Sequence, residues 1–165
     1  MTDYTAIRQH AVKSGEPTCV AFSELIDQIG RLANVIEAVG NGLARPSGQS
    51  LARWQVLAAV DTQPAPVSGI AERLGHSRQS VQRIADLLVD DELALYRPNP
   101  AHRRAKMLEI TPAGLTALHR MQALFDQLAQ RTSAGLEPEH LDLARHTLIE
   151  LRQRLEAELP HLPRS

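Results

Sequence analysis

The stretch from Val67 to Thr111 constrains the fold of this chain more than any other. The sequence predicts a short helix over Val67–Leu74 that ends at Gly75, because glycine most readily takes the left-handed conformation that closes a helix. Ser77 follows at the position of an N-cap, where its hydroxyl can accept a hydrogen bond from the backbone of the next helix. Two helices separated by a glycine turn are typical of a helix-turn-helix, which places its second helix in the major groove of DNA.

The helix predicted after this turn, Arg78–Val89, has one apolar and one polar face. Val81, Ile84, Leu87 and Leu88 recur at helical spacing and predict its buried face. The polar face and the cap supply the candidate DNA contacts, which are Ser77, Arg78, Gln79, Ser80, Gln82 and Arg83. Arginine suits guanine and glutamine suits adenine, because each can form two hydrogen bonds to that base edge. The alternative is a solvated polar face, which any surface helix has.

Two strand-like runs follow, Leu93–Arg97 and Ala105–Ile110, joined by the segment PNPAHRR. The prolines remove backbone donors and favour a turn. Four cations surround this turn, with no acidic residue among them: Arg97, Arg103, Arg104 and Lys106. A basic β-hairpin beside a recognition helix is a wing, and its cations suit phosphates or a narrow minor groove. Arg103, Arg104 and Lys106 are therefore predicted to contact DNA.

The chain as a whole is not basic, since its formal net charge is −1. DNA binding must therefore depend on where the charges lie. Acidic residues gather at the far end of the predicted recognition helix, at Asp86, Asp90, Asp91 and Glu92. This polarity would direct the first half of the helix towards phosphate and keep the second half away from it. Aromatic residues make up 3% of the chain, which argues against a stacking platform for single strands.

Long apolar seams flank this central stretch. The first lies in a helix predicted over residues 18–43, at Phe22, Leu25, Ile29, Leu32, Ile36, Val39 and Leu43. Residues 112–159 are predicted to form two more helices, the last with a similar seam at Leu141, Ala144, Leu148, Leu151 and Leu155. These seams exceed what a small helix-turn-helix core can cover, which favours a two-fold dimer with interlocking terminal helices. The alternative is an intramolecular helix pair in a monomer.

Other functional classes receive little support. Cys19 is the only cysteine, so the chain cannot form an internal disulfide and a reducing compartment fits. No apolar run approaches the roughly 20 residues of a membrane span, and no signal peptide opens the chain, which predicts a cytoplasmic protein. No cysteine or histidine pair has structural-zinc spacing, so no metal or cofactor is predicted. A phosphate loop, a nucleophile elbow and a paired-carboxylate signature are missing too, which disfavours an enzyme.

Three segments resemble the MarR family of bacterial transcriptional regulators. They are LARWQVLAAV (51–60), VSGIAERLGHSRQSVQRIADLL (67–88) and RPNPAHRRAKMLEITPAG (97–114). The resemblance implies a mainly α fold with a small β-wing, in one domain over residues 1–165. A winged helix-turn-helix at 50–111 would lie between dimerisation helices at 18–43 and 112–159. It also implies a homodimer that binds a pseudo-palindromic operator in double-stranded DNA.

Many members of the family repress transcription and are released by a small ligand, often phenolic or otherwise aromatic. Here the resemblance implies an effector pocket beside Trp54 and Met121, although Trp54 is most simply a core anchor. Some members respond to oxidation, and Cys19 lies where one such branch has a reactive thiol. The alternative interpretation is that Cys19 is a small residue of the core with no reactive role. Two alternatives therefore stay open: a redox-sensing regulator acting through Cys19, and a winged-helix module that binds protein without specific DNA binding.

The chain departs from the family pattern at two positions. Glu92 stands where a glycine usually ends the recognition helix, so the turn must either avoid the left-handed conformation or accept strain. His102 replaces the aspartate that usually precedes the two wing arginines. This histidine is either a solvent-exposed loop residue or a source of pH sensitivity in the wing.

Overall fold

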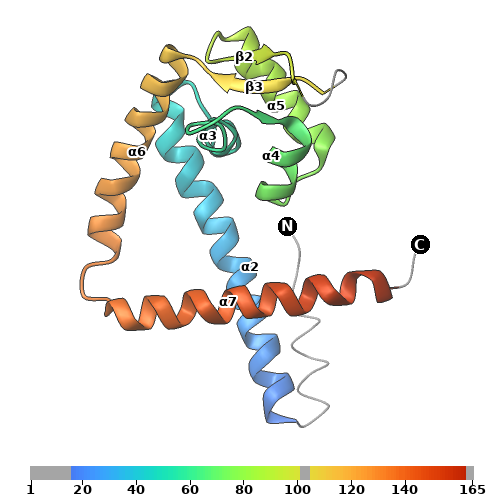
Figure 1. The fold of residues 1–165 in the computed structure, drawn as a ribbon. Helices are drawn as coiled ribbons and strands as arrows, with labels where there is room; N and C mark the ends of the chain where they lie inside the picture. Colours follow the sequence, from blue (N-terminus) through green and yellow to red (C-terminus); the bar gives the residue numbers. More distant parts are fainter. Residues whose placement is uncertain (1–15, 101–104, 163–165) are drawn as a thin grey trace. The chain divides into compact units, whose positions relative to one another are not determined.

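The computed structural model describes residues 16–100 and 105–162 (Figure 1). Its elements are α2 (Pro17–Ala44), the 3-10 turn Arg45–Ser47, α3 (Leu51–Ala58), β1 (Ala65–Pro66), α4 (Val67–Leu74), α5 (Arg78–Asp90), β2 (Ala94–Arg97), β3 (Met107–Ile110), α6 (Pro112–Thr132), α7 (Pro138–Glu158) and the 3-10 turn Leu159–His161. Helices dominate and the sheet is small, which confirms the predicted fold class. The described residues divide into two compact units, with the boundary between Phe125 and Asp126.

The core of the first unit lies between α3, α4, α5 and the sheet. Its fully buried side chains include Val56, Leu57, Ile70, Val81, Leu88 and Leu108. The predicted buried face of α5 is wrong at one position, because Leu87 is 43% exposed and Ala85 is buried instead. Helical geometry explains the difference. Val81, Ala85 and Leu88 follow one another at steps of four and three and share a face, whereas Leu87 is turned away from it.

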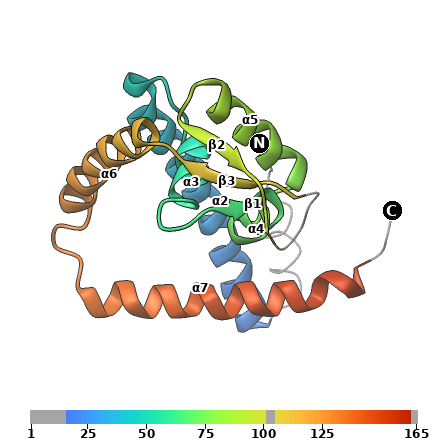
Figure 2. The same cartoon turned by 45° about the horizontal axis from the view of Figure 1, so that its top comes forward.

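The strands form an antiparallel sheet in the order β1-β3-β2. Arg97 of β2 pairs with Met107 of β3, and Ala94 pairs with Ile110. The predicted hairpin is thus confirmed, with slightly shorter strands than expected. The proline-rich sequence before α4 predicts only a turn, yet Ala65 and Pro66 pair with the other side of β3. Proline is tolerated in an edge strand, where its missing donor costs no ladder hydrogen bond. In two views β2 lies beside α5 (Figures 1 and 2).

A left-handed turn connects the end of α5 to β2. Glu92 takes a φ of 58°, so the chain accepts the strain that a glycine would avoid. The start of α6 packs against this turn. The Thr111 hydroxyl donates to the Glu92 carbonyl at 2.7 Å and accepts from the Gly114 amide at 3.0 Å, so Thr111 caps the start of α6. A Cβ at Gly114 would lie 1.9 Å from the Leu93 carbonyl oxygen, so this position requires glycine.

The second unit consists of the end of α6, helix α7 and the turn after it. Every residue of α7 is described, and none of them is buried. Leu141, Leu148 and Leu155 of the predicted seam are each more than two-fifths exposed. Within residues 16–100 and 105–162, no helix is both long enough and apolar enough to cross a bilayer.

Candidate nucleic-acid interface

The turn between α4 and α5 has the predicted geometry. Gly75 takes a φ of 65°, and its amide donates to carbonyl oxygens of the last turn of α4. The hydroxyl of Ser77 accepts from the Ser80 amide at 3.1 Å, which confirms Ser77 as the N-cap of α5. The local sequence is sufficient for this result, because both features depend on conformational preferences of single residues.

The candidate contact residues on the first half of α5 are accessible. Ser77, Arg78, Gln79, Ser80 and Arg83 are exposed, whereas Gln82 is half-buried. Neither Arg78 nor Arg83 forms an ion pair with any residue that the structure describes. Their charges are therefore available to an external anion such as a phosphate.

Other cations near α5 are already engaged. Arg53 forms an ion pair with Asp91. Arg97 of β2 pairs with Glu109 of β3, with Nε 2.8 Å from Oε2. The sequence places no acid between Arg97 and Lys106, but the hairpin register brings Glu109 across to Arg97. The wing therefore has less unpaired charge than its sequence indicates.

Two predicted contacts of the wing, Arg103 and Arg104, lie outside the described residues, as does His102. Lys106 is described and exposed. Its Nζ lies 5.6 Å from the centre of the Tyr96 ring, within the range of a cation–π contact. The base of the wing thus presents one lysine charge above an aromatic ring beside α5.

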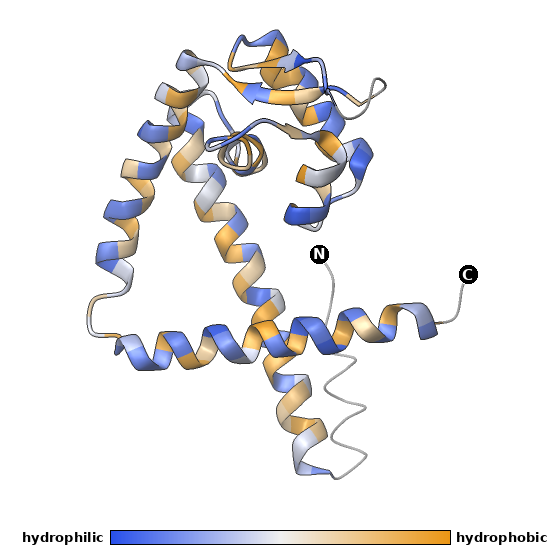
Figure 3. Cartoon of the chain, in the orientation of Figure 1, coloured by the Kyte–Doolittle hydropathy of each residue, from blue (hydrophilic) through white to orange (hydrophobic). Residues whose placement is uncertain are grey.

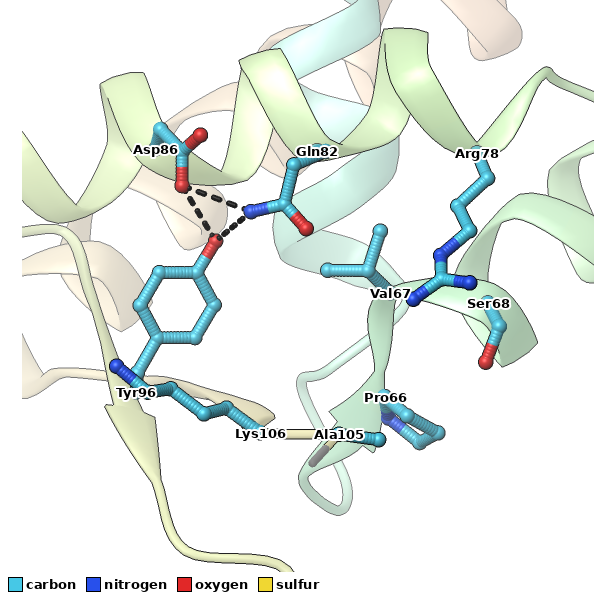
Figure 4. Close-up of a pocket in the computed structure, with 9 residues that line it drawn as sticks. All are labelled: Pro66, Val67, Ser68, Arg78, Gln82, Asp86, Tyr96, Ala105 and Lys106. Carbon is cyan, nitrogen blue, oxygen red and sulfur yellow. Dashed lines mark hydrogen bonds between the residues drawn. The ribbon is translucent and has the colours of Figure 1, made fainter. Parts of the chain in front are cut away.

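Between the wing, α4 and α5 lies a pocket of about 320 Å³ (Figure 4). Its lining comprises Pro66, Val67, Ser68, Arg78, Gln82, Asp86, Tyr96, Ala105 and Lys106. Three of these, Arg78, Gln82 and Lys106, are predicted DNA contacts. The fold therefore brings residues from α5 and the wing together around one hollow, although they lie up to 28 positions apart in the sequence.

Three polar side chains meet at one side of this pocket. The Tyr96 hydroxyl donates to Oδ1 of Asp86 at 2.7 Å. The amide nitrogen of Gln82 donates to the same oxygen at 2.9 Å and to the Tyr96 oxygen at 2.7 Å. Burial, followed by the interaction with Asp86, raises the pKa of Tyr96 to about 12, so the phenol is neutral at physiological pH. Sequence reasoning missed Tyr96 and the role of Asp86, because these contacts join β2 to α5 without any periodic signal.

The two predicted effector residues belong to the first unit, where Met121 is buried and Trp54 is half-buried. Met121 is 1% exposed, and Trp54 packs at a tilt against Phe125 with ring centroids 5.5 Å apart. The Nε1 donor of Trp54 is buried and has no hydrogen-bond partner in the part of the chain that the structure describes. Such an unpaired donor carries a desolvation cost that a ligand oxygen could remove. Phe125 was not predicted, since single aromatic residues on a helix give no specific signal.

Cys19 is exposed, so its interpretation as a small core residue is wrong. Its thiol donates to the Glu16 carboxylate at 3.4 Å, and this hydrogen bond raises the pKa of Cys19 above its usual value. A raised pKa keeps the thiol protonated at neutral pH, whereas peroxide-sensing thiols react as thiolates. Among the described residues, no group of three or more histidine, cysteine, aspartate or glutamate side chains could hold a metal ion.

Comparison with known proteins connects this geometry to a family. A family model described as MarR family matches residues 47–105. A protein of Mycobacterium tuberculosis is 33% identical over 139 residues, covering 84% of this chain and 97% of the relative. The M. tuberculosis transcriptional regulator MosR, solved in complex with DNA, superposes with a TM-score of 0.66 at 24% identity, covering 80% of this chain and 96% of that one. CouR of Rhodococcus jostii RHA1, solved with p-coumaroyl-CoA bound, superposes with a TM-score of 0.69 at 21% identity, covering 75% and 88%.

Proposed function

The chain belongs to the MarR family of transcriptional regulators, and we propose that it is a repressor that binds a pseudo-palindromic operator as a homodimer. The observation that carries the proposal is the capped helix α5, whose first half presents Arg78, Gln79 and Arg83 beside the wing. In a helix-turn-helix, the first residues of the second helix reach base edges in the major groove. Lys106, Arg103 and Arg104 would then bind the flanking backbone or minor groove.

Electrostatics along α5 support this orientation. The unpaired cations lie at or near its start, and the carboxylates Asp86, Asp90 and Asp91 lie towards its end. A phosphate backbone would attract the first part and repel the second. The N-terminus also carries the positive end of the helix dipole, which adds to the attraction for phosphate.

The exposed apolar side chains of the flanking helices support the homodimer. In α2, Phe22, Leu32 and Ile36 are 40–54% exposed. In α7 the seam is equally uncovered, and hydrophobic residues recur along both helices (Figure 3). Exposed apolar residues at these spacings indicate a partner surface, and a second copy supplies the same seams in a self-complementary arrangement.

A two-fold dimer has a direct consequence for the operator. Its two α5 helices would lie in successive major grooves on one face of the duplex, about 10 base pairs apart. The operator would therefore be an inverted repeat, with each half-site read by one protomer.

We further propose that a small aromatic ligand releases the operator. The Trp54–Phe125 pair and the unpaired Nε1 donor of Trp54 offer an aromatic wall and a hydrogen bond to such a ligand. The aromatic acyl group bound by CouR is an example of this chemistry in a protein of similar fold. The ligand would act by binding a conformation in which the two recognition helices have the wrong spacing for DNA.

Selection of bound sequences from a random duplex pool at physiological salt tests the proposal. We expect recovery of an inverted repeat with half-sites about 10 base pairs apart. Recovery of no motif, together with binding that vanishes as salt rises, would indicate phosphate attraction alone and would contradict the proposal.

A further inference from the structure

Gln82 occupies an unusual position among the candidate base contacts. It lies on the recognition helix between the exposed Arg78 and Arg83, but its own side chain is half-buried. The two hydrogen bonds of its amide nitrogen, to Asp86 and Tyr96, hold it against the pocket wall. Figure 4 shows its carbonyl oxygen directed away from both partners, towards the side of the pocket where Val67 and Arg78 lie.

The chemistry of the three partners determines this orientation. An Asp86 carboxylate can only accept hydrogen bonds, so both the Tyr96 hydroxyl and the Gln82 amide must donate to it. The Tyr96 proton is then used, and its oxygen can accept from the same amide nitrogen. A reversed amide would place the Gln82 carbonyl oxygen against two acceptor oxygens. The network therefore turns the nitrogen of Gln82 inward and its oxygen outward.

We propose that Tyr96 and Asp86 are positioning residues that present Gln82 to DNA as a single hydrogen-bond acceptor, so that Gln82 selects the amino bases adenine and cytosine. This inference rests on the proposed function, since it requires α5 to lie in the major groove. An unrestrained glutamine offers a donor and an acceptor and pairs with adenine through two hydrogen bonds. With its nitrogen engaged, Gln82 retains only the acceptor. In the major groove, adenine N6 and cytosine N4 both donate to such an acceptor, whereas guanine O6 and thymine O4 do not.

The test compares sequence selections by the wild-type chain, Gln82→Ala, Tyr96→Phe and the double variant. The operator position that loses its preference in Gln82→Ala is the position that Gln82 reads. At that position we expect the wild type to recover adenine and cytosine at frequencies that differ by less than about threefold. Guanine and thymine should each be recovered about fivefold less often than these two bases, which is the preference that one hydrogen bond allows. Tyr96→Phe keeps the aromatic ring but frees one N–H of Gln82. Adenine should then exceed cytosine by about tenfold, because the second hydrogen bond becomes available.

The double variant is the matched control. Tyr96→Phe should change no preference at this position when residue 82 is already alanine, because Tyr96 acts only through Gln82. A merely structural role for Tyr96 predicts a different result, namely lower stability with the same base preference in both backgrounds. An unchanged adenine-to-cytosine ratio in Tyr96→Phe would therefore overturn the inference.

A second measurement does not require DNA. The side-chain amide resonances of Gln82, assigned by their loss in Gln82→Ala, should shift in Tyr96→Phe, and their protons should exchange faster with water. Resonances unmoved by Tyr96→Phe would show that the hydrogen bond is missing in solution and would overturn the inference.

Failure of the inference is distinguishable from failure of the proposed function. If the wild type selects an inverted repeat in which no position depends on Gln82, only the inference about Gln82 is contradicted. If the wild type selects no motif at all, both the inference and the proposed function are contradicted.

Discussion

Glu92 shows how one residue can add strain to an otherwise favourable fold. Its φ of 58° lies in the left-handed region, which costs about 1–2 kcal/mol for a residue with a Cβ. Glycine removes that cost but loses about 0.5–1 kcal/mol through the freedom of the unfolded chain. We therefore expect Glu92→Gly to raise the free energy of unfolding by up to about 1 kcal/mol. Urea denaturation measures the change, and Glu92→Ala, which keeps the Cβ, is the control. A gain in the alanine variant equal to that in the glycine variant would contradict the strain.

Gly114, unlike Glu92, lies at a position where no side chain fits. Because a Cβ there would lie 1.9 Å from the Leu93 carbonyl oxygen, Gly114→Ala must displace the backbone at the start of α6. We expect a loss of at least about 2 kcal/mol in the free energy of unfolding, as for other overpacked sites. Gly42→Ala is the matched control, because its Cβ would meet nothing within 4 Å and alanine favours a helix. Equal effects of the two substitutions on the urea midpoint would refute this interpretation.

Tyr96 gives a prediction for high pH. Its pKa in the folded chain is about 12, above the ordinary value of 10, so the folded state favours the neutral phenol. The contribution of the neutral Tyr96 phenol to the free energy of unfolding is therefore fully present below pH 10 and is lost as the pH rises towards 12. Ultraviolet titration of phenolate absorbance should show one of the two tyrosines ionising near pH 12, and that step should be missing in Tyr96→Phe. A Tyr96-dependent step near pH 10 would be inconsistent with the buried network.

At the scale of elements, the proposed function assigns separate roles to the wing and the recognition helix. Phosphate contacts of the wing should contribute about one unit each to the slope of binding affinity against salt. We expect the double substitution Arg103→Ala and Arg104→Ala to weaken binding to specific and random duplexes alike, and to lower the slope by about two. Titrations at several salt concentrations measure this. Unchanged affinity at low salt would exclude these arginines from the interface.

The helices and their caps could be predicted because their signals are local. Gly75 and Ser77 each act within one turn of the chain, and helical spacing identified most of the buried face of α5. The two-residue strand β1 is too short to produce a pattern.

The contacts between elements could not be predicted in the same way. The Arg97–Glu109 ion pair depends on hairpin register, and the contact of Tyr96 with Asp86 depends on how β2 packs against α5. The burial of Met121 and the Trp54–Phe125 contact likewise depend on packing between α3 and α6. Single-residue preferences do not encode these tertiary distances.

At the scale of the whole molecule, the central claim is that two recognition helices read two half-sites together. On this claim, the exposed seams of α2 and α7 would bind a second copy, and the pocket beside α5 would lie at the site of base contact. Neither is sufficient alone, because a monomer would bind a half-site only weakly and nonspecific phosphate attraction would compete with it.

Binding to operators of altered spacing tests this claim most directly. Five base pairs inserted between the selected half-sites would turn them to opposite faces of the duplex, since a helical turn contains about 10 base pairs. We expect the affinity to fall to that of a duplex with a single half-site, and the complex with the unaltered operator to contain two chains. Equal affinity for the altered and unaltered operators, with one chain bound per half-site independently, would contradict paired reading by a dimer.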